Sequence, residues 1–205
     1  MIQQKKKNNF EKARKIFQEH NGILRTSQAL KLGIHSDTLY AMYGERQITR
    51  ESRGVYRLAD LPALSNPDLV QVALRVPKAV ICLISALAFH DLTTQIPHRV
   101  YIALPRKMQK PFMQYPPLEV ILRPHIPYNA GIEEHTLDGV TIRIYNQEKT
   151  ITDCLRYEKR VGKDVVLEAL KEYRRQNKVN VAALMEYARI NKVSERMQAY
   201  LEILL

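Results

Sequence analysis

The amino-acid sequence predicts an α+β protein with two domains. Residues 1–60 show short helical patterns followed by a hairpin pattern, residues 68–145 mix strands with helices, and the chain is helical from Glu148 onward. The segment ADLPALSNPDL contains two prolines and no apolar periodicity, which indicates a linker near residues 59–68. We therefore predict an N-terminal domain at residues 1–60 and a C-terminal domain at residues 61–205.

Three short helices are predicted in the N-terminal domain. Apolar residues recur at helical spacing over residues 9–20, and a second helix covers residues 26–32. Ser36 is the expected cap of a third helix at residues 37–46. The segment ITRESRGVYRLAD then gives two extended runs around a turn, which predicts a β-hairpin. Three helices followed by a hairpin is the order of a winged helix.

The corner between the second and third helices has the pattern of a helix-turn-helix. This motif needs a small residue where the helices touch, a glycine at the turn, and apolar residues that hold the second helix at a steep angle. We assign this inward face to Ala29, Leu32, Gly33, Ile34, Leu39 and Met42. The outward residues of the third helix are then His35, Ser36, Asp37, Tyr40, Ala41 and Gly44.

The outward side of this corner is the predicted DNA-binding surface. Its outward residues near the start of the third helix would reach base edges in a major groove, and neighbouring donors would bind phosphates. Arg53, beside Gly54 at the hairpin tip, is the candidate for a minor groove or for the backbone. Asp37 would repel phosphate, so we expect it to face a cytosine amino group or to stabilise the helix N-terminus. The predicted DNA-binding residues are Arg25, Thr26, Ser27, His35, Ser36, Asp37, Thr38, Tyr40, Tyr43, Arg46, Arg50, Arg53 and Arg57.

The charge of the chain also favours a polyanionic partner. The sequence has 32 lysines and arginines against 21 acidic residues, a net charge of +11. Residues 1–60 alone hold 12 basic and 6 acidic residues, so the excess is densest around the predicted corner. A basic surface that only keeps the protein soluble is the alternative.

The C-terminal domain is predicted to hold a small sheet and a helical end. Residues 68–76 and 78–91 have helical patterns, the second strongly apolar, and residues 100–105 and 118–124 are predicted strands. In HTLDGVTIRIY an Asp-Gly turn joins two extended runs, which predicts a hairpin. Helices are expected at residues 148–160, 163–176, 180–190 and 194–205.

Three segments of the sequence resemble the AbiEi antitoxins of bacterial abortive-infection systems. The first is GILRTSQALKLGIHSDTLYAMYGERQITRESRGVYRLAD, which ends in the predicted outgoing hairpin strand. The others are ISALAFHDLTTQIPHRVYIALPR at residues 84–106 and IYNQEKTITDCLRYEKRVGKDVVLEALKEYRR at residues 144–175. Together they span residues 22–175 of the chain in the family's order.

The resemblance implies a two-domain transcriptional autorepressor and antitoxin. In this family a winged helix represses its own operon, with cooperative binding to paired inverted repeats, and the C-terminal domain is required for antitoxin action. The toxin is nucleotidyltransferase-like, and in this type IV arrangement it is opposed without a stable complex. Sequestration of the toxin by direct binding is a further alternative.

A nuclease-like enzyme acting through the C-terminal domain is the competing interpretation. Such a site would need two or three converging carboxylates around Mg²⁺. The available acids do not suggest convergence, the histidines have no zinc-ligand spacing, and no glycine-rich phosphate loop is present. We therefore predict no enzyme activity, no catalytic residues, no metal and no cofactor. The acids are Glu133, Glu134, Asp138, Glu148, Asp153 and Glu158.

The remaining features concern location and a second basic surface. Cys82 and Cys154 form no CxxC motif, which is typical of buried thiols in a reducing compartment. The longest apolar run, at residues 79–89, is too short to span a bilayer, and the N-terminus lacks the apolar core of a secretory signal. We expect a cytoplasmic protein with no membrane partner.

Residues 156–178 carry eight basic residues, which form either a solvated helix face or a second surface that contacts DNA or RNA.

Overall fold

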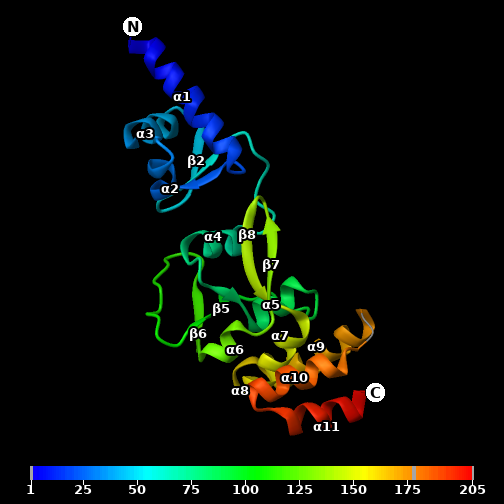
Figure 1. Ribbon diagram of the computed structural model, residues 1–205. Coiled ribbons are helices and arrows are strands. Elements are labelled where there is room, and N and C mark those ends of the chain that lie inside the picture. Colours follow the sequence, from blue (N-terminus) through cyan, green and yellow to red (C-terminus); the bar gives the residue numbers. More distant parts are fainter. Residues whose placement is uncertain (1, 177–178, 205) are drawn as a thin grey trace. The chain divides into compact units, whose positions relative to one another are not determined.

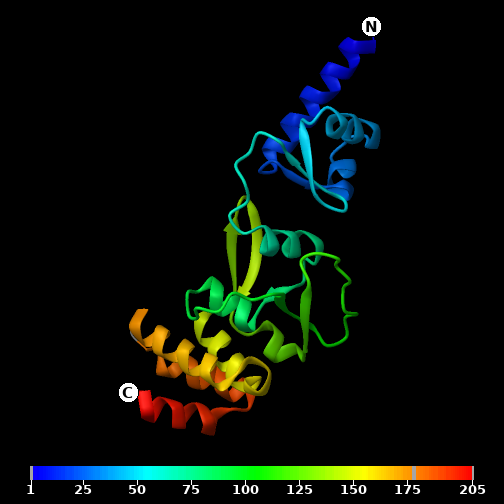
Figure 2. The same ribbon diagram turned by 180° about the vertical axis from the view of Figure 1, so that it is seen from behind.

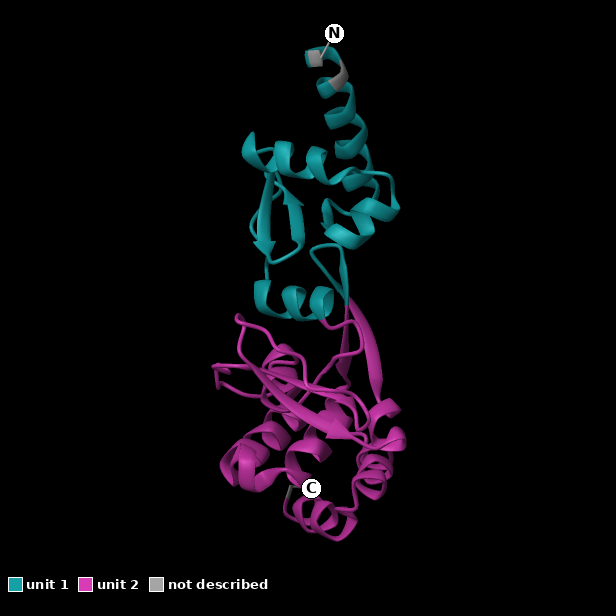
Figure 3. Cartoon of the chain, turned by 90° about the vertical axis from the view of Figure 1, so that its left-hand side faces the viewer, with its two compact units in different colours: residues 1–75, 136–141 teal, residues 76–135, 142–205 magenta. Residues whose placement is uncertain are grey.

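A computed structural model describes residues 2–176 and 179–204, and the chain divides into two compact units. Unit 1 is formed by residues 1–75 and 136–141, and unit 2 by residues 76–135 and 142–205 (Figure 3). Helices and two small sheets make up the described chain, so the α+β class is confirmed. These units differ from the predicted division after residue 60, because the segment up to residue 75 and the tip of a later hairpin belong with unit 1.

Unit 1 combines three N-terminal helices, a three-stranded antiparallel sheet in the order β1-β3-β2, and a fourth helix. The predicted helices and hairpin are present (Figure 1). Strand β1 was not predicted, because three residues are too few to show a period of two. The elements are α1 (Ile2–Glu19), β1 (Ile23–Arg25), α2 (Thr26–Lys31), α3 (Ser36–Gly44), β2 (Ile48–Ser52), β3 (Val55–Leu58) and α4 (Pro67–Arg75).

The core of unit 1 lies between α1, the α2–α3 corner and the sheet. Phe10, Ala13 and Phe17 of α1 pack against Leu39 and Met42 of α3, all of them buried. Helix α1 begins before the predicted residue 9, since the polar residues that precede Phe10 show no apolar periodicity by which a helix could be recognised. The amphipathic part of α1 therefore anchors it to the corner.

The turn between α2 and α3 closes α2 with paired backbone hydrogen bonds. Gly33 has a φ of +88°, its N–H donates to Leu30 O at 3.1 Å, and the N–H of Ile34 donates to Ala29 O at 2.9 Å. This is the Schellman arrangement, and its usual apolar contact is supplied by Ala29 and Ile34, which are both buried in the same core. The predicted turn glycine thus occupies the position at which a left-handed backbone is needed.

Three details of the predicted corner are wrong. Ser36 is the first residue of α3, and the N-cap position is taken by His35, whose side chain makes no capping hydrogen bond. Leu32 is 39% exposed because it ends α2 on the solvent side of the turn. Ala41, predicted to point outward, is partly buried against the core.

Unit 2 contains most of a five-stranded sheet in the order β6-β5-β4-β8-β7, followed by a group of helices. The tip of the β7–β8 hairpin, with Asp138 and Gly139 both at positive φ, is the part counted with unit 1. The helices that follow the sheet lie together at one end of unit 2 in both views (Figures 1 and 2). The elements are β4 (Val80–Ile81), α5 (Leu83–Phe89), β5 (Val100–Pro105), β6 (Leu118–Arg123), α6 (His125–Asn129), β7 (Ile132–Leu137), β8 (Val140–Tyr145), α7 (Gln147–Arg156), α8 (Glu158–Val161), α9 (Lys163–Gln176), α10 (Val181–Asn191) and α11 (Ser194–Leu204).

The structure corrects the predicted helix at residues 78–91. Val80 and Ile81 form the central strand β4, antiparallel to β5 and parallel to β8, and α5 begins only at Leu83. Every residue from Ala79 to Leu87 is buried. A segment buried on all sides has no polar face to mark its period, so a strand followed by a helix looks like one apolar helix.

Helix α7 is the central element of the helical group. It packs against α5, α9 and α10, and all seven residues from Lys149 to Leu155 are buried. The buried set includes one lysine, two threonines and one aspartate, so polar groups must find partners inside unit 2. These partners include Arg123, the last residue of β6.

Candidate nucleic-acid interface

The start of α2 and the tip of the β2–β3 hairpin are fixed to each other. The backbone N–H of Thr26 donates to Gly54 O at 2.9 Å, and its hydroxyl lies 3.4 Å from the same oxygen. Strand β1 pairs with β3, with Arg25 opposite Val55. The hairpin tip, which carries the exposed Arg53, is therefore held beside Arg25 and Thr26.

One face of α3 forms an exposed stripe. Ser36, Asp37, Tyr40 and Tyr43 follow each other at intervals of one, three and three residues, and all four are exposed. Tyr40 is 64% exposed and Tyr43 47%, whereas Leu39 and Met42 on the opposite side are fully buried. The Tyr43 ring contacts the edge of Tyr56 on β3 with centroids 6.1 Å apart. Tyr43 therefore covers part of the sheet, and Tyr40 projects into solvent.

Two predicted residues of the third helix lie on its other side, next to α1. His35 and Thr38 line a small cavity of about 60 Å³ with Asn9, Lys12 and Gly33. His35 is exposed and Thr38 is partly buried. The structure thus separates these two side chains from the Ser36–Tyr43 stripe, and it places Lys12 of α1 near them.

Exposed basic and hydroxyl side chains also occur on α2, after α3 and on the β2–β3 hairpin. Ser27, Arg46, Arg50 and Arg53 are exposed, as predicted for groups that meet a polyanion. Arg50 lies on β2 opposite Tyr56, and Arg53 lies between β2 and β3. Flexible guanidinium groups of this kind suit phosphate oxygens, because they keep their charge and offer several donors.

Arg25 has a basic neighbour that sequence reasoning missed. Burial lowers the pKa of the Arg25 guanidinium below its usual value, and the positive charge of Arg75 lowers it further. An arginine still keeps its proton at neutral pH, so two positive charges act on each other at this point. Arg75 ends α4, 50 residues further along the chain, and no local pattern connects it with the corner.

Arg57 does not belong to the exposed set. It is 8% exposed, and its guanidinium donates to the carbonyl oxygen of Leu61 at 3.4 Å and to that of Pro62. These bonds turn the side chain toward the segment that follows β3, so the structure does not place Arg57 with the exposed predicted residues. Arg57 instead ties the sheet of unit 1 to residues 59–66.

The acidic residues considered for catalysis do not converge. Five of the six form a hydrogen bond or ion pair with a different partner residue each. Among the described residues, no three His, Cys, Asp or Glu side chains are close enough to hold a metal ion. These partners are Ser65 for Asp138, Tyr173 for Glu148, Tyr200 and Arg196 for Glu158, His135 for Glu133, and Lys149 with Arg123 for Asp153.

Three arginines of segment 156–178 have polar partners on α10, on β6 and within α9. Arg156 donates to Asn191 O at 2.7 Å, Arg160 pairs with Glu119 at 3.2 Å and Arg175 pairs with Glu172 at 2.6 Å. Lys159, Lys163 and Lys171 are exposed, and Lys178 lies outside the described residues. The choice between a solvated face and a second nucleic-acid surface is therefore not decided by these contacts.

The cysteines and the hydropathy of the helices complete the description. Cys82 and Cys154 are free, buried thiols, and burial raises the pKa of both. A raised pKa keeps the thiols protonated and unreactive at neutral pH. Within residues 2–176 and 179–204, no helix combines the length and apolar character that crossing a membrane requires.

No protein-family model matches the sequence, and no curated protein matches it significantly. The resemblance to AbiEi antitoxins therefore depends on the three segments quoted above.

Proposed function

We propose that unit 1 is a winged-helix DNA-binding module and that the protein is a transcriptional autorepressor and antitoxin. In this proposal α3 is the recognition helix that enters the major groove, and the β2–β3 hairpin is the wing. The order α1-β1-α2-α3-β2-β3 and the sheet order β1-β3-β2 support this assignment. Arg53 of the wing binds the backbone or an adjacent minor groove.

The observation that carries the proposal is the bond between Thr26 and Gly54. It joins the hairpin tip to the start of α2, which supports a single binding surface made of Arg53 and the helix-turn-helix. A recognition helix reads bases only when phosphate contacts on either side fix its register. In this proposal Arg46, which follows α3, and Arg53 on the wing give such contacts, and both are exposed.

The antitoxin part of the proposal comes from the family resemblance. On that resemblance we propose that the protein is the antitoxin of a type IV system and opposes a nucleotidyltransferase-like toxin. The proposed cytoplasmic location comes from the buried thiols. The excess of positive charge in residues 1–60 is in keeping with an operator-binding N-terminal unit. Paired inverted repeats upstream of the gene are the expected operator.

The proposal is tested by fluorescence anisotropy with the full-length protein. DNA from directly upstream of its gene is titrated beside a shuffled duplex, at low and at physiological salt. We expect the preference for upstream DNA to survive at physiological salt, because base contacts do not depend on counterion release. Equal binding that salt abolishes for both duplexes would contradict sequence recognition.

The wing is tested by Arg53→Ala in the same assay. Loss of one phosphate contact is expected to weaken binding to both duplexes and to reduce the slope of log K against log salt by about 0.9. Lys15→Ala is the matched control, because it removes one exposed positive charge from α1 that is not among the predicted DNA-binding residues. An equal change of slope in both variants would show a general charge effect and no specific role of the wing.

A further inference from the structure

A basic pocket lies in unit 2, where strands β5 and β6 end. It has a volume of about 650 Å³, and five cationic side chains line it, with no carboxylate among its lining residues. The five are Lys78, Arg106, Lys107, Arg123 and Arg143. Neither the proposed DNA surface of unit 1 nor the family resemblance accounts for this concentration of charge.

The strand register explains why these residues meet. Strands β5 and β6 are parallel, and Pro105 pairs with Arg123, so both strands end at the same edge of the sheet. Strand β4 runs antiparallel to β5 and begins at this edge, just after Lys78. Strand β8 runs parallel to β4 and supplies Arg143. The carboxyl ends of parallel strands are a common place for a ligand, because loops that diverge there leave a crevice.

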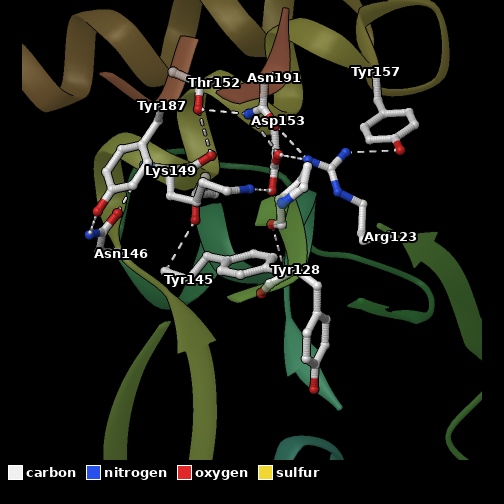
Figure 4. Close-up of polar contacts among 12 residues, drawn as sticks. Arg123, Tyr128, Tyr145, Asn146, Lys149, Thr152, Asp153, Tyr157, Tyr187 and Asn191 are labelled. Atoms are coloured by element: carbon white, nitrogen blue, oxygen red, sulfur yellow. Dashed lines mark hydrogen bonds and ion pairs between the residues drawn. The ribbon is translucent and has the colours of Figure 1, made fainter. Parts of the chain in front are cut away.

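Arg123 of the pocket wall belongs to a buried cluster with excess positive charge (Figure 4). Arg123 is 2% exposed, and it donates to Asp153 at 2.9 Å and to the hydroxyl of Tyr157 at 3.0 Å. Lys149 is fully buried, and its Nζ lies 2.5 Å from the other oxygen of Asp153. One carboxylate therefore serves two cations, and the cluster carries a net charge of +1 when both are protonated.

The guanidinium of Arg123 also has an unused donor. Among the described residues, its buried Nε has no hydrogen-bond partner. A buried charge or hydrogen-bond donor without a partner raises the free energy of the folded state, because it has lost its hydrogen bonds to water and has not replaced them. An anion in the adjoining pocket would lower that cost by neutralising the excess charge of the cluster.

The outer cations of the pocket are not neutralised by carboxylates, and Arg143 among them is oriented by a neutral group. Lys78, Arg106, Lys107 and Arg143 form no ion pair within 4.0 Å with any described carboxylate. Arg143 donates to the hydroxyl of Tyr128 at 3.1 Å, and that hydroxyl donates to the carbonyl of Lys78 at 2.6 Å. Cations that are oriented by neutral groups keep their full attraction for an anionic ligand.

We propose that this pocket binds a phosphorylated small molecule of nucleotide size. Its volume lies within the range usual for ligand pockets of roughly 300–1,000 Å³. Guanidinium groups at the rim suit phosphate oxygens, which they bind by two parallel hydrogen bonds. Pro105 and Pro124 give the pocket apolar wall surface against which a base or sugar can pack. The site is independent of the proposed DNA surface and adds a ligand to the proposed function.

Calorimetric titration of the full-length protein with ATP, inorganic triphosphate and adenosine tests the ligand class. We expect ATP to bind, triphosphate to compete with it, and adenosine to bind at least about tenfold more weakly, because it lacks the phosphates. Absence of ATP binding up to about 1 mM, or equal affinity for adenosine, would overturn the proposal. A short single-stranded RNA that binds this pocket without competition from ATP would identify a nucleic-acid site and would also overturn it.

Two charge reversals test the location. Arg106→Glu is expected to weaken ATP binding at least about tenfold, since it puts a carboxylate where a phosphate should lie. Lys171→Glu, on the exposed side of α9, changes the net charge by the same amount and should leave the affinity unchanged. Thermal unfolding of both variants verifies that they fold. Equal losses in both variants, or no loss in Arg106→Glu, would show that ATP does not occupy this pocket.

Arg53→Ala separates this proposal from the proposed DNA binding. The variant should lose operator affinity and keep its affinity for ATP. Loss of ATP binding in Arg53→Ala would place the nucleotide on unit 1 and overturn the pocket assignment. Failure of operator binding in the wild type, with ATP binding intact, would instead contradict only the winged-helix proposal.

Discussion

Asp153 neutralises two buried cations at the same time, Lys149 on its own helix and Arg123 at the end of β6. Its Oδ1 also accepts a hydrogen bond from Asn191 at 2.8 Å. Burial lowers the pKa of Lys149, and the charge of Asp153 opposes that shift. The Asp153 carboxylate is therefore the counterion of both Lys149 and Arg123 in the interior of unit 2.

Asp153→Asn is expected to lower the free energy of unfolding by about 3–5 kcal/mol, because it leaves two buried cations without a counterion. Lys149→Met should lower the free energy of unfolding by less than Asp153→Asn, since it leaves Arg123 and Asp153 as a one-to-one ion pair. Glu133→Gln, at an exposed carboxylate, should change stability by less than about 0.5 kcal/mol. Urea denaturation measures all three. A loss for Lys149→Met that equals or exceeds the loss for Asp153→Asn would contradict the assignment of excess positive charge to the cluster.

At the scale of elements, the α2–α3 corner depends on one backbone conformation. Gly33 has a φ of +88° and an added Cβ would meet no atom within 4 Å, so the requirement for glycine there is conformational. Gly44, the last residue of α3, is equally open and has an ordinary φ. Replacing each glycine by alanine therefore tests the same change at one left-handed and one ordinary backbone position.

Gly33→Ala is expected to destabilise unit 1 by about 1–2 kcal/mol, because a left-handed conformation is costly for a residue with a Cβ. Gly44→Ala should be neutral or stabilising by up to about 1 kcal/mol, since alanine is the better helix former. The change in the midpoint of unfolding, measured by circular dichroism for each variant, shows whether the two substitutions differ in this way. Equal effects of the two substitutions would show that the turn at Gly33 has no special backbone requirement.

At the scale of the whole molecule, the stability of unit 2 depends on pH through His90. Its Nε2 lies 2.8 Å from the carbonyl oxygen of Tyr145, so this nitrogen carries the proton of the neutral ring. Burial lowers the pKa of His90, and the Tyr145 carbonyl and the carboxylates Glu133 and Glu148 oppose this only in part. The unfolded chain therefore binds the proton more tightly than the folded chain.

The free energy of unfolding should be highest above the ordinary histidine pKa of about 6.5 and should fall as the pH drops toward the lower pKa of folded His90. His90→Gln is expected to reduce this loss, and the exposed His98→Gln should retain it. Urea denaturation at about pH 7.5 and about pH 5.5 measures the difference. The same pH dependence in wild type and His90→Gln would exclude His90 as its source.

The sequence by itself determined the features that depend on neighbouring residues. Strand β5 was predicted without a boundary error, the Asp138–Gly139 turn and the Gly33 turn were located, and α9 has the predicted limits. These signals are local, because a helical or strand period and a left-handed turn depend on a few consecutive residues. The exposure of Ser36, Asp37, Tyr40, Arg46, Arg50 and Arg53 followed from the same periods. Their contact with DNA remains a prediction.

Only the tertiary structure decided which distant residues meet and which charged groups are buried. It placed β4 at the centre of a sheet, turned Arg57 inward, and brought Arg75 next to Arg25. It also joined Arg123 to Asp153 and gathered the cations of the basic pocket from separate strands. Such contacts join residues tens of positions apart and are selected by the packing of whole elements. The period of the sequence shows which face of an element is buried, and the fold alone shows what that face meets.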